Sequence, residues 1–197
     1  MRLPLSAQAE APWLVREIAT DFTLDEVWEF PIVADADKGE TFRTFCEDQD
    51  LASAEPLPGL AGKLMQLRLL LGKIGLDQRI NELPIPGCSE TSVGARLTAG
   101  TRRGGGPVNE RLPFRIVYDL ENERLLELSN GTVHALLHFS WAHKQGALHA
   151  PRMAVYVKPR GWFGRLYMGL IYPFRVLFVY PAIMRSAKRR WERHHVN

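Results

Sequence analysis

The segment from Gly161 to His195, GWFGRLYMGLIYPFRVLFVYPAIMRSAKRRWERHH, places over twenty mostly apolar residues directly before a cluster of bases. A membrane span needs about 20 apolar residues with few charges. Residues 162–184 have that length, but they are interrupted by Arg165, Arg175, Pro173 and Pro181, and a central Arg costs roughly 2.5–3.5 kcal/mol on insertion. The sequence therefore favours a long terminal helix, kinked at the prolines, with its apolar side buried against a sheet. A helix lying on a membrane surface is the second interpretation.

Length and composition indicate one soluble, cytoplasmic domain spanning residues 1–197. Of the 197 residues, 46% are apolar and 24% are charged, which is ordinary for a globular protein. Cys46 and Cys88 have neither disulfide-framework nor zinc-ligand spacing, so reduced thiols are expected. Residues 1–12 lack the apolar core of a secretion signal and are expected to be flexible.

The charge is unevenly distributed. Nine Lys or Arg and one acid lie between Lys158 and the C-terminus, so this segment carries +8; the whole chain carries +3, which leaves −5 on residues 1–157. A basic stripe of this kind could meet anionic lipid, nucleic acid or the acidic half of the same chain. No nucleic-acid recognition motif accompanies it, so a nucleic-acid partner is not expected. The oligomeric state does not follow from the sequence.

The first half of the chain contains both helical and strand-like patterns. WLVREI (13–18) suits a strand, and the short apolar DEVWEFP (25–31) ends at Pro31. Residues 37–47 and 60–77 favour two helices, the second with leucines at spacings of three and four. Residues 82–111 read as a long loop, with one helical turn that Ser89 could cap. The run TRRGGGP within it lacks the Lys-Ser/Thr of a phosphate-binding loop.

The second half is rich in strand patterns, over 112–119, 123–143 and 151–158. Asn130-Gly131 between two apolar runs is a strong hairpin signal, because both turn residues need positive φ. A two-residue loop places Glu127 opposite His134, Glu123 opposite His138 and Leu126 beside Ala135. One sheet face is then apolar and carries Leu126, Leu128, Val133, Ala135, Leu137, Phe139 and Trp141. The other is mixed and would face outward.

The stretches SNGTVHALLHFSW (129–141), MAVYVKPRG (153–161) and YMGLIYPFRVLFVYPAIMR (167–185) resemble a bacterial family of unknown function in the START-like (SRPBCC, helix-grip) superfamily. WEFP, GLD (75–77) and LPIPG (83–87) also match. The resemblance implies an α+β helix-grip fold: an antiparallel sheet wrapped on a long C-terminal helix, with two shorter helices. Such proteins enclose an apolar cavity, and some are cyclases, dehydratases or hydrolases. The resemblance carries over no catalytic residue.

The expected function is binding of a small hydrophobic or lipid-like ligand between sheet and C-terminal helix. The expected wall consists of Leu126, Val133, Ala135, Leu137, Phe139, Trp141, Met153, Val155 and Tyr156 or its neighbours, closed by Tyr167, Ile171, Phe174 and Phe178. Phe174 and Phe178, one helical turn apart, are expected to be buried. No cofactor is expected.

Two alternatives remain. The first is an enzyme of the same fold, in which Glu127 orients His134 as acid/base; a polar pair on the outer side of the sheet competes with that interpretation. The second is peripheral membrane association through the basic helix. If the helix is buried, binding to anionic lipid would be weak and would fade with salt. His134 and His138 lie about 13 Å apart on a strand, too far to share one metal ion.

Overall fold

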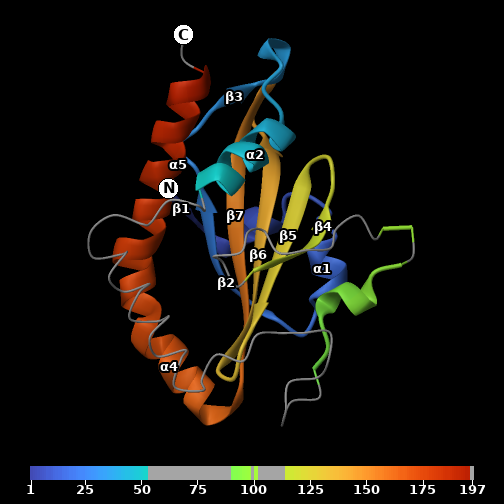
Figure 1. Cartoon of the computed structure of the whole chain (residues 1–197), viewed down its shortest axis with the longest axis vertical. Coiled ribbons are helices and arrows are strands. Elements are labelled where there is room, and N and C mark those ends of the chain that lie inside the picture. The colour runs from blue at the N-terminus through green and yellow to red at the C-terminus, as the bar shows by residue number, and fades with distance from the viewer. Residues whose placement is uncertain (53–89, 99, 102–113, 196–197) are drawn as a thin grey trace.

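The computed structural model describes residues 1–52, 90–98, 100–101 and 114–195, which form an α+β fold. A seven-stranded antiparallel sheet has the order β1-β2-β7-β6-β5-β4, with β3 paired to β7. A long C-terminal helix runs beside the sheet (Figure 1). The expected class, an antiparallel sheet with a long final helix, is confirmed.

The strands are β1 (Arg2–Leu3), β2 (Thr23–Glu29), β3 (Ala34–Asp35), β4 (Arg115–Asp119), β5 (Glu123–Ser129), β6 (Val133–His143) and β7 (Leu148–Pro159). The longest two, β6 and β7, lie at the centre and pair along their whole length. Gly146, with φ of 58°, forms the turn between them. Their β-branched and aromatic content suits a sheet that is covered on both faces.

The helical elements are η1 (Leu5–Ala9), α1 (Val15–Ile18), η2 (Ala36–Lys38), α2 (Phe42–Ala52), η4 (Val93–Arg96), α4 (Gly161–Phe174), the π-helical η5 (Arg175–Val179) and α5 (Tyr180–His195). The last three form one continuous helix. Pro173 and Pro181 lack the N–H that a regular helix uses at their positions, so the hydrogen-bond register changes between them.

The hairpin differs in register from the prediction. Ser129 pairs with His134 and Glu127 with Leu136, so every β5 residue meets a partner two positions later than predicted. Asn130 and Gly131 do not have positive φ. Instead, the Asn130 side chain accepts hydrogen bonds from the Thr132 and Val133 amides and from the Thr132 hydroxyl, an arrangement typical of an Asx turn. A shift of two residues preserves the side-chain alternation, so the predicted faces are retained.

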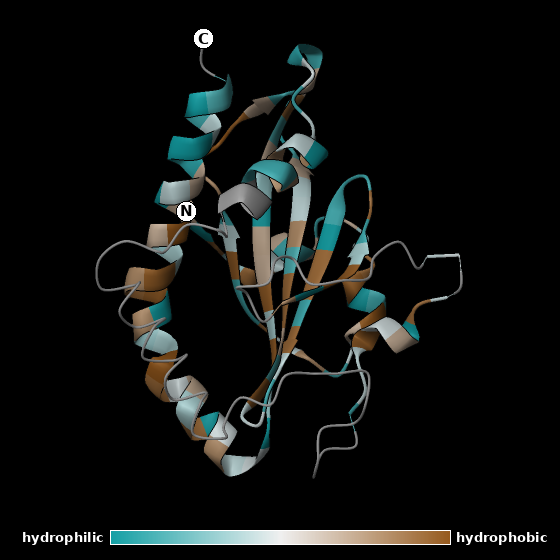
Figure 2. Cartoon of the chain, viewed as in Figure 1, coloured by the Kyte–Doolittle hydropathy of each residue, from teal (hydrophilic) through white to brown (hydrophobic). Residues whose placement is uncertain are grey.

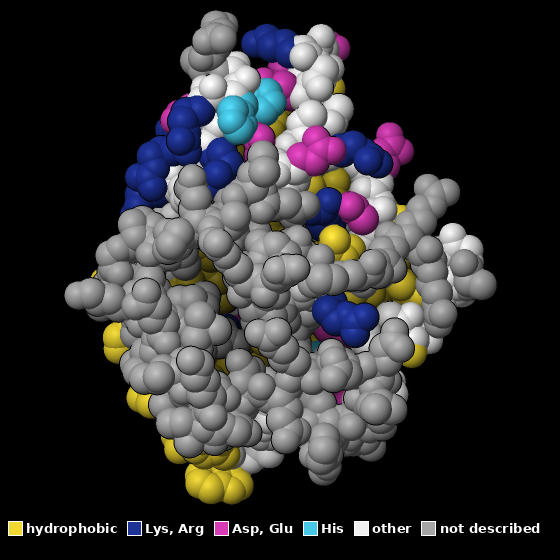
Figure 3. All heavy atoms as spheres, viewed as in Figure 1, with side chains coloured by type: hydrophobic (Ala, Val, Ile, Leu, Met, Phe, Trp, Pro, Cys, Tyr) yellow, Lys and Arg dark blue, Asp and Glu magenta, His cyan; other side chains and the backbone are white. Residues whose placement is uncertain are grey.

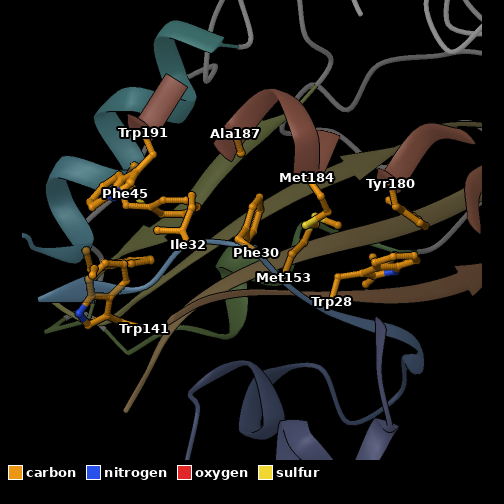
Figure 4. Packing of buried hydrophobic residues seen from close by; sticks show 14 of the residues in the cluster. Trp28, Phe30, Ile32, Phe45, Trp141, Met153, Tyr180, Met184, Ala187 and Trp191 are labelled. Carbon is orange, nitrogen blue, oxygen red and sulfur yellow. The ribbon is translucent and has the colours of Figure 1, made fainter. Parts of the chain in front are cut away.

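One sheet face packs against α5 and α2. Tyr180, Met184, Ala187 and Trp191 of α5 point toward the sheet and α2, as Figure 4 shows. They meet residues of four other segments: Trp28, Phe30 and Ile32 of β2 and the chain after it, Phe42 and Phe45 of α2, Trp141 of β6, and Met153 of β7. The terminal helix therefore packs on the apolar face of the sheet, and α5 makes these contacts.

The opposite, mixed face is also covered, which corrects the expectation that it faces outward. Residues of η1, α1 and η4, among them Ala7, Val15 and Val93, pack there on Leu125, Leu136, Ala154 and Tyr156. Tyr156, offered as a wall residue facing the C-terminal helix, thus lies on this other face, and its neighbours Val155 and Val157 face the helix.

Several local predictions can be compared with the structure. Residues 13–18 were predicted as a strand, but Val15 and Ile18, three positions apart, are both buried on a single helical turn. Residues 1–12, expected to be flexible, contain β1, which pairs with β2, and η1, whose Ala7 and Gln8 are buried.

The predicted helical turn within residues 82–111 is confirmed at η4, but its N-terminal cap is Ser92 and not Ser89. The predicted helix 60–77, Ser89 and most of the loop 82–111 lie outside the described residues.

The first half of the C-terminal helix is largely exposed. Gly164 and Met168 are its buried residues in α4, and η5 has none. Phe174 and Phe178, predicted to be buried, are 43% and 40% exposed and contact each other, with ring centroids 6.3 Å apart. The prediction failed because helical spacing identifies one apolar face, whereas this helix is apolar on both its inner and outer faces over this stretch (Figure 2).

Close packing at the start of α4 gives a matched pair of tests. A Cβ built on Gly164 would lie 2.2 Å from the Thr132 carbonyl oxygen, whereas one on Gly169 meets nothing within 4 Å. Gly164→Ala should therefore destabilise the protein by about 1–3 kcal/mol. Gly169→Ala should stabilise it by up to about 1 kcal/mol, because alanine is the better helix former. Denaturant unfolding measures both, and equal effects would show that α4 does not approach the hairpin this closely.

Candidate functional site

The apolar wall expected from the sequence is largely assembled. Val133, Trp141, Met153 and Val155 belong to the buried cluster beneath the C-terminal helix, and Ala135, Leu137, Phe139, Tyr167 and Ile171 are partly buried against it. Leu126, on the same face by its register with Leu137, is also buried. Phe174 and Phe178 are the two expected wall residues that the structure places on the exposed side of the helix.

The side chains of β6 alternate between full and partial burial. His134, Leu136 and His138, on the mixed face, are fully buried, whereas the intervening Ala135, Leu137 and Phe139, on the face toward the C-terminal helix, keep partial exposure. β6 is a central strand, so its side chains would be fully covered if the layer above were close-packed. Among the described residues, the packing above these three side chains is therefore less complete than on the opposite face.

A group of charged residues borders this apolar face. Glu26 of β2 is fully buried, accepts a hydrogen bond of 2.8 Å from the Trp28 indole and lies 3.7 Å from the Arg175 guanidinium. Arg175 donates a 2.6 Å hydrogen bond to Asp25. Burial, only partly offset by Trp28 and Arg175, raises the pKa of Glu26. The sequence analysis did not predict this group, although a carboxylate at an inward position of the strand-like segment 25–31 is a signal for it.

The predicted Glu127–His134 pair forms despite the altered register. His134 is diagonal to Glu127 across the hairpin, and its Nε2 lies 2.6 Å from the Glu127 carboxylate. That carboxylate also accepts hydrogen bonds from the Ser92 hydroxyl and, at 2.8 Å, from the Val93 amide. Burial favours its neutral form, but these donors outweigh burial and lower the pKa of Glu127. Through the bonds from Ser92 and Val93 to Glu127, the pair links η4 to the β5–β6 hairpin.

The position of this pair limits what it can do chemically. His134 is 2% exposed, and its ring and that of Phe22 form a T-shaped pair with centroids 4.8 Å apart. Its Nδ1 lies 3.6 Å from Glu90, which also binds Lys158 and Arg160. A ligand between the sheet and the C-terminal helix would lie on the other side of the sheet, out of reach of this imidazole.

A second buried pair, His138 and Glu123, lies further along the same face. Glu123 accepts hydrogen bonds from the Leu14 amide at 3.0 Å, the Tyr118 hydroxyl at 2.8 Å and His138 Nε2 at 2.8 Å. The Gln8 amide nitrogen lies 2.9 Å from His138 Nδ1. The Gln8 amide nitrogen can only donate, so His138 Nδ1 accepts, while His138 Nε2 donates to Glu123. An imidazole with one donating and one accepting nitrogen is neutral. Sequence reasoning placed Glu123 near His138 but missed Gln8 and Tyr118.

The buried His138 should give a distinct titration. Burial, partly offset by Glu123, lowers its pKa below the usual 6.5. The unfolded chain then takes up this proton at a higher pH than the native state, so stability should fall as the pH drops below about 6.5. NMR titration of the His138 ring protons should give a midpoint below 6.5. A midpoint at or above 6.5 would contradict this burial.

The 35-residue helix Gly161–His195 is long and apolar enough to cross a membrane by length and composition, although this is weak support for a span. Only 17% of its most apolar stretch is buried within the protein. Among the described residues, no group of three or more His, Cys, Asp or Glu could hold a metal ion.

Comparison with known proteins identifies the family. No curated protein and no solved structure matches the chain. A family described as "Protein of unknown function (DUF2867)" matches residues 18–182. This range extends from the end of α1 into α5, so it includes the described strands β2–β7, both buried His–Glu pairs and the exposed half of the C-terminal helix. The chain therefore belongs to the DUF2867 family.

Proposed function

We propose that the protein binds a small hydrophobic or lipid-like ligand between the sheet and the C-terminal helix. The observation that carries this proposal is the partial exposure of Ala135, Leu137 and Phe139 in the middle of the sheet. Facing them, Tyr167 and Ile171 are also only partly buried. Ligand sites are predominantly apolar with a few polar groups, and both walls here are apolar.

The charged residues at the border would orient the ligand. Arg175 joins η5 to β2 through Asp25, and Glu26 lies directly beside it. A ligand with an apolar body and one polar end would place that end near these groups. The architecture, an antiparallel sheet packed on a terminal helix, supports the proposal that the protein is a member of the START-like superfamily. We also propose that it is cytoplasmic.

Catalysis by His134 and Glu127 receives less support. Both oxygens of Glu127 already accept hydrogen bonds, and the pair lies on the sheet face opposite the apolar wall. A general base must reach the proton that it removes. The contacts of this pair favour a structural role.

A substitution that fills the space tests the binding proposal. Ala135→Leu adds three carbons above the middle of β6, where the side chain is only partly buried. Binding of a fluorescent fatty acid, followed by titration, should weaken by about tenfold or more, because pocket methylenes are worth at least that factor. Native mass spectrometry of the purified protein should also show a co-purified apolar molecule.

The control changes the outer side of the C-terminal helix, away from the sheet. Leu166→Glu with Leu170→Glu alters residues that are 61% and 68% exposed, so fatty-acid binding should stay within about twofold of the unmodified protein. Loss of binding in this control, with Ala135→Leu unaffected, would refute a site between sheet and helix. Circular dichroism confirms that each variant is folded.

A further inference from the structure

The outer face of α4 and η5 is apolar over four turns. Seven of its large side chains are between 40% and 73% exposed: Trp162, Phe163, Leu166, Leu170, Phe174, Leu177 and Phe178. We call this set the outer stripe. From Leu166 to Phe178, every exposed residue is apolar or glycine. Soluble proteins rarely leave so continuous an apolar surface without a binding partner.

The one charged residue within this stretch is directed away from the outer stripe. Arg175 lies between Phe174 and Leu177 in sequence, but its side chain is only 15% exposed and its guanidinium donates to Asp25 of β2. The ion pair therefore removes a cation from the outer surface, and the exposed side chains from Leu166 to Phe178 are left wholly apolar. A helix that simply needed solvation would benefit from the opposite orientation.

Basic residues flank the outer stripe on both sides. Arg165 is exposed near its start, and the exposed residues of α5 beyond its end include Arg185, Lys188, Arg189 and Arg193. Figure 3 shows the apolar side chains along the lower edge of the molecule, over α4, and Lys and Arg gathered above them, over α5. An exposed Trp at the beginning of the helix is also typical of membrane interfaces.

We propose that the outer stripe is a membrane-docking surface, which enters the acyl boundary of an anionic bilayer while the bases of α5 contact lipid headgroups. The charge distribution favours this occupant over a second copy of the chain. The exposed charges of α4 and α5 are mostly basic, with Arg165, Arg185, Lys188, Arg189 and Arg193 against the exposed acid Glu192. This excess complements anionic lipid and opposes close approach of two identical segments. The helix would lie in the interface, since α5 is held by the sheet and α2.

Vesicle co-sedimentation tests the proposal. The full chain is mixed with phosphatidylcholine vesicles, with and without phosphatidylglycerol, at low and high salt. Binding should be strongest to the anionic vesicles and should be reduced but not abolished by salt, because only the contribution of the bases is screened. Leu166→Glu with Leu170→Glu should weaken binding about 30-fold, equivalent to about 2 kcal/mol.

The control adds the same charge elsewhere. Leu5→Glu with Val33→Glu changes two residues that are 46% and 64% exposed outside the outer stripe, and it should bind vesicles nearly as the unmodified chain does. Equal binding by both double variants would refute the proposal, as would failure of the unmodified chain to bind anionic vesicles. Light scattering that shows a dimer dispersed by the outer-stripe variant would assign the surface to a second copy instead.

A site-specific label distinguishes insertion from mere adhesion. An environment-sensitive fluorophore is attached to Leu170→Cys or, as control, to Val33→Cys, each in a Cys88→Ser background; Cys46 is buried. Anionic vesicles should shift the emission of the label at position 170 to shorter wavelength and leave that at 33 unchanged. No shift at 170 in the bound protein would show that the outer stripe does not enter lipid. Neither result depends on fatty-acid binding by the opposite side of the helix.

Discussion

Replacing Phe45 by alanine should lower the free energy of unfolding by about 3–5 kcal/mol. Phe45 is completely buried and lies against Phe30, Phe42, Trp141 and Trp191, with ring centroids between 5.1 and 6.4 Å away. It thereby connects α2, β6 and α5, and its removal would leave a cavity at their junction. The melting temperature should fall by roughly 6–20 °C for a chain of this length.

The matched control is Phe174→Ala, the same change on a side chain that is 43% exposed. We expect a loss below about 1 kcal/mol, as for surface substitutions generally. Comparable losses for the two variants, in denaturant unfolding at one pH, would show that α4 and η5 pack against the sheet as firmly as α5 does.

Glu123→Ala should cost about 3–5 kcal/mol. It removes the acceptor of three hydrogen bonds, from the Leu14 amide, the Tyr118 hydroxyl and His138. Each buried donor left without a partner costs about 1–3 kcal/mol. Glu123→Ala should also weaken the attachment of η1 and α1 to the sheet, because Gln8 bonds to His138 and the Leu14 amide bonds to Glu123.

Two variants calibrate this result. Glu121→Ala removes an exposed carboxylate two residues away and should change stability by less than about 0.5 kcal/mol. Glu123→Gln keeps an acceptor oxygen, so its loss of stability should lie between those of Glu121→Ala and Glu123→Ala. An effect of Glu123→Ala no larger than that of Glu121→Ala would mean that water replaces the lost contacts, and that this face is less tightly covered than described.

Periodicity in the sequence was sufficient to predict the strands of the second half of the chain and which residues share each face. Strands alternate with a period of two, so the apolar and mixed faces of β5 and β6 were assigned correctly even though the turn was not. The predicted two-residue turn was wrong because the Asn130 side chain competes with the backbone for the Thr132 and Val133 amides. Such local competition is invisible to a rule based on the Asn-Gly pair alone.

The C-terminal helix shows the limit of apolar patterning. Tyr180 and Trp191 are buried while Phe174 and Phe178 are exposed, although all four are aromatic residues of one continuous helix. The π-helical turn at η5 and the ion pair between Arg175 and Asp25 determine which aromatic side chains face the sheet. Both are tertiary features, and neither follows from residue spacing.

The candidate site was predicted in part. The apolar wall on β6 and β7 followed from alternation, as did the proximity of Glu127 to His134. The contacts that Ser92, Gln8 and Arg175 contribute come from segments distant in sequence, so no local pattern could indicate them. The family has no described function, so the role of the site rests on its geometry.

Photo-crosslinking of a diazirine-bearing fatty acid tests the central claim, ligand binding between sheet and helix, most directly. The protein is irradiated with the probe in the absence of membrane, digested and mapped by mass spectrometry. We expect adducts on the inward side chains of β6 and α4, at Leu137, Phe139 or Tyr167, with loss of labelling in Ala135→Leu. Labelling confined to the exposed Leu166, Leu170 or Phe174, and unchanged in Ala135→Leu, would contradict a ligand site beneath the helix.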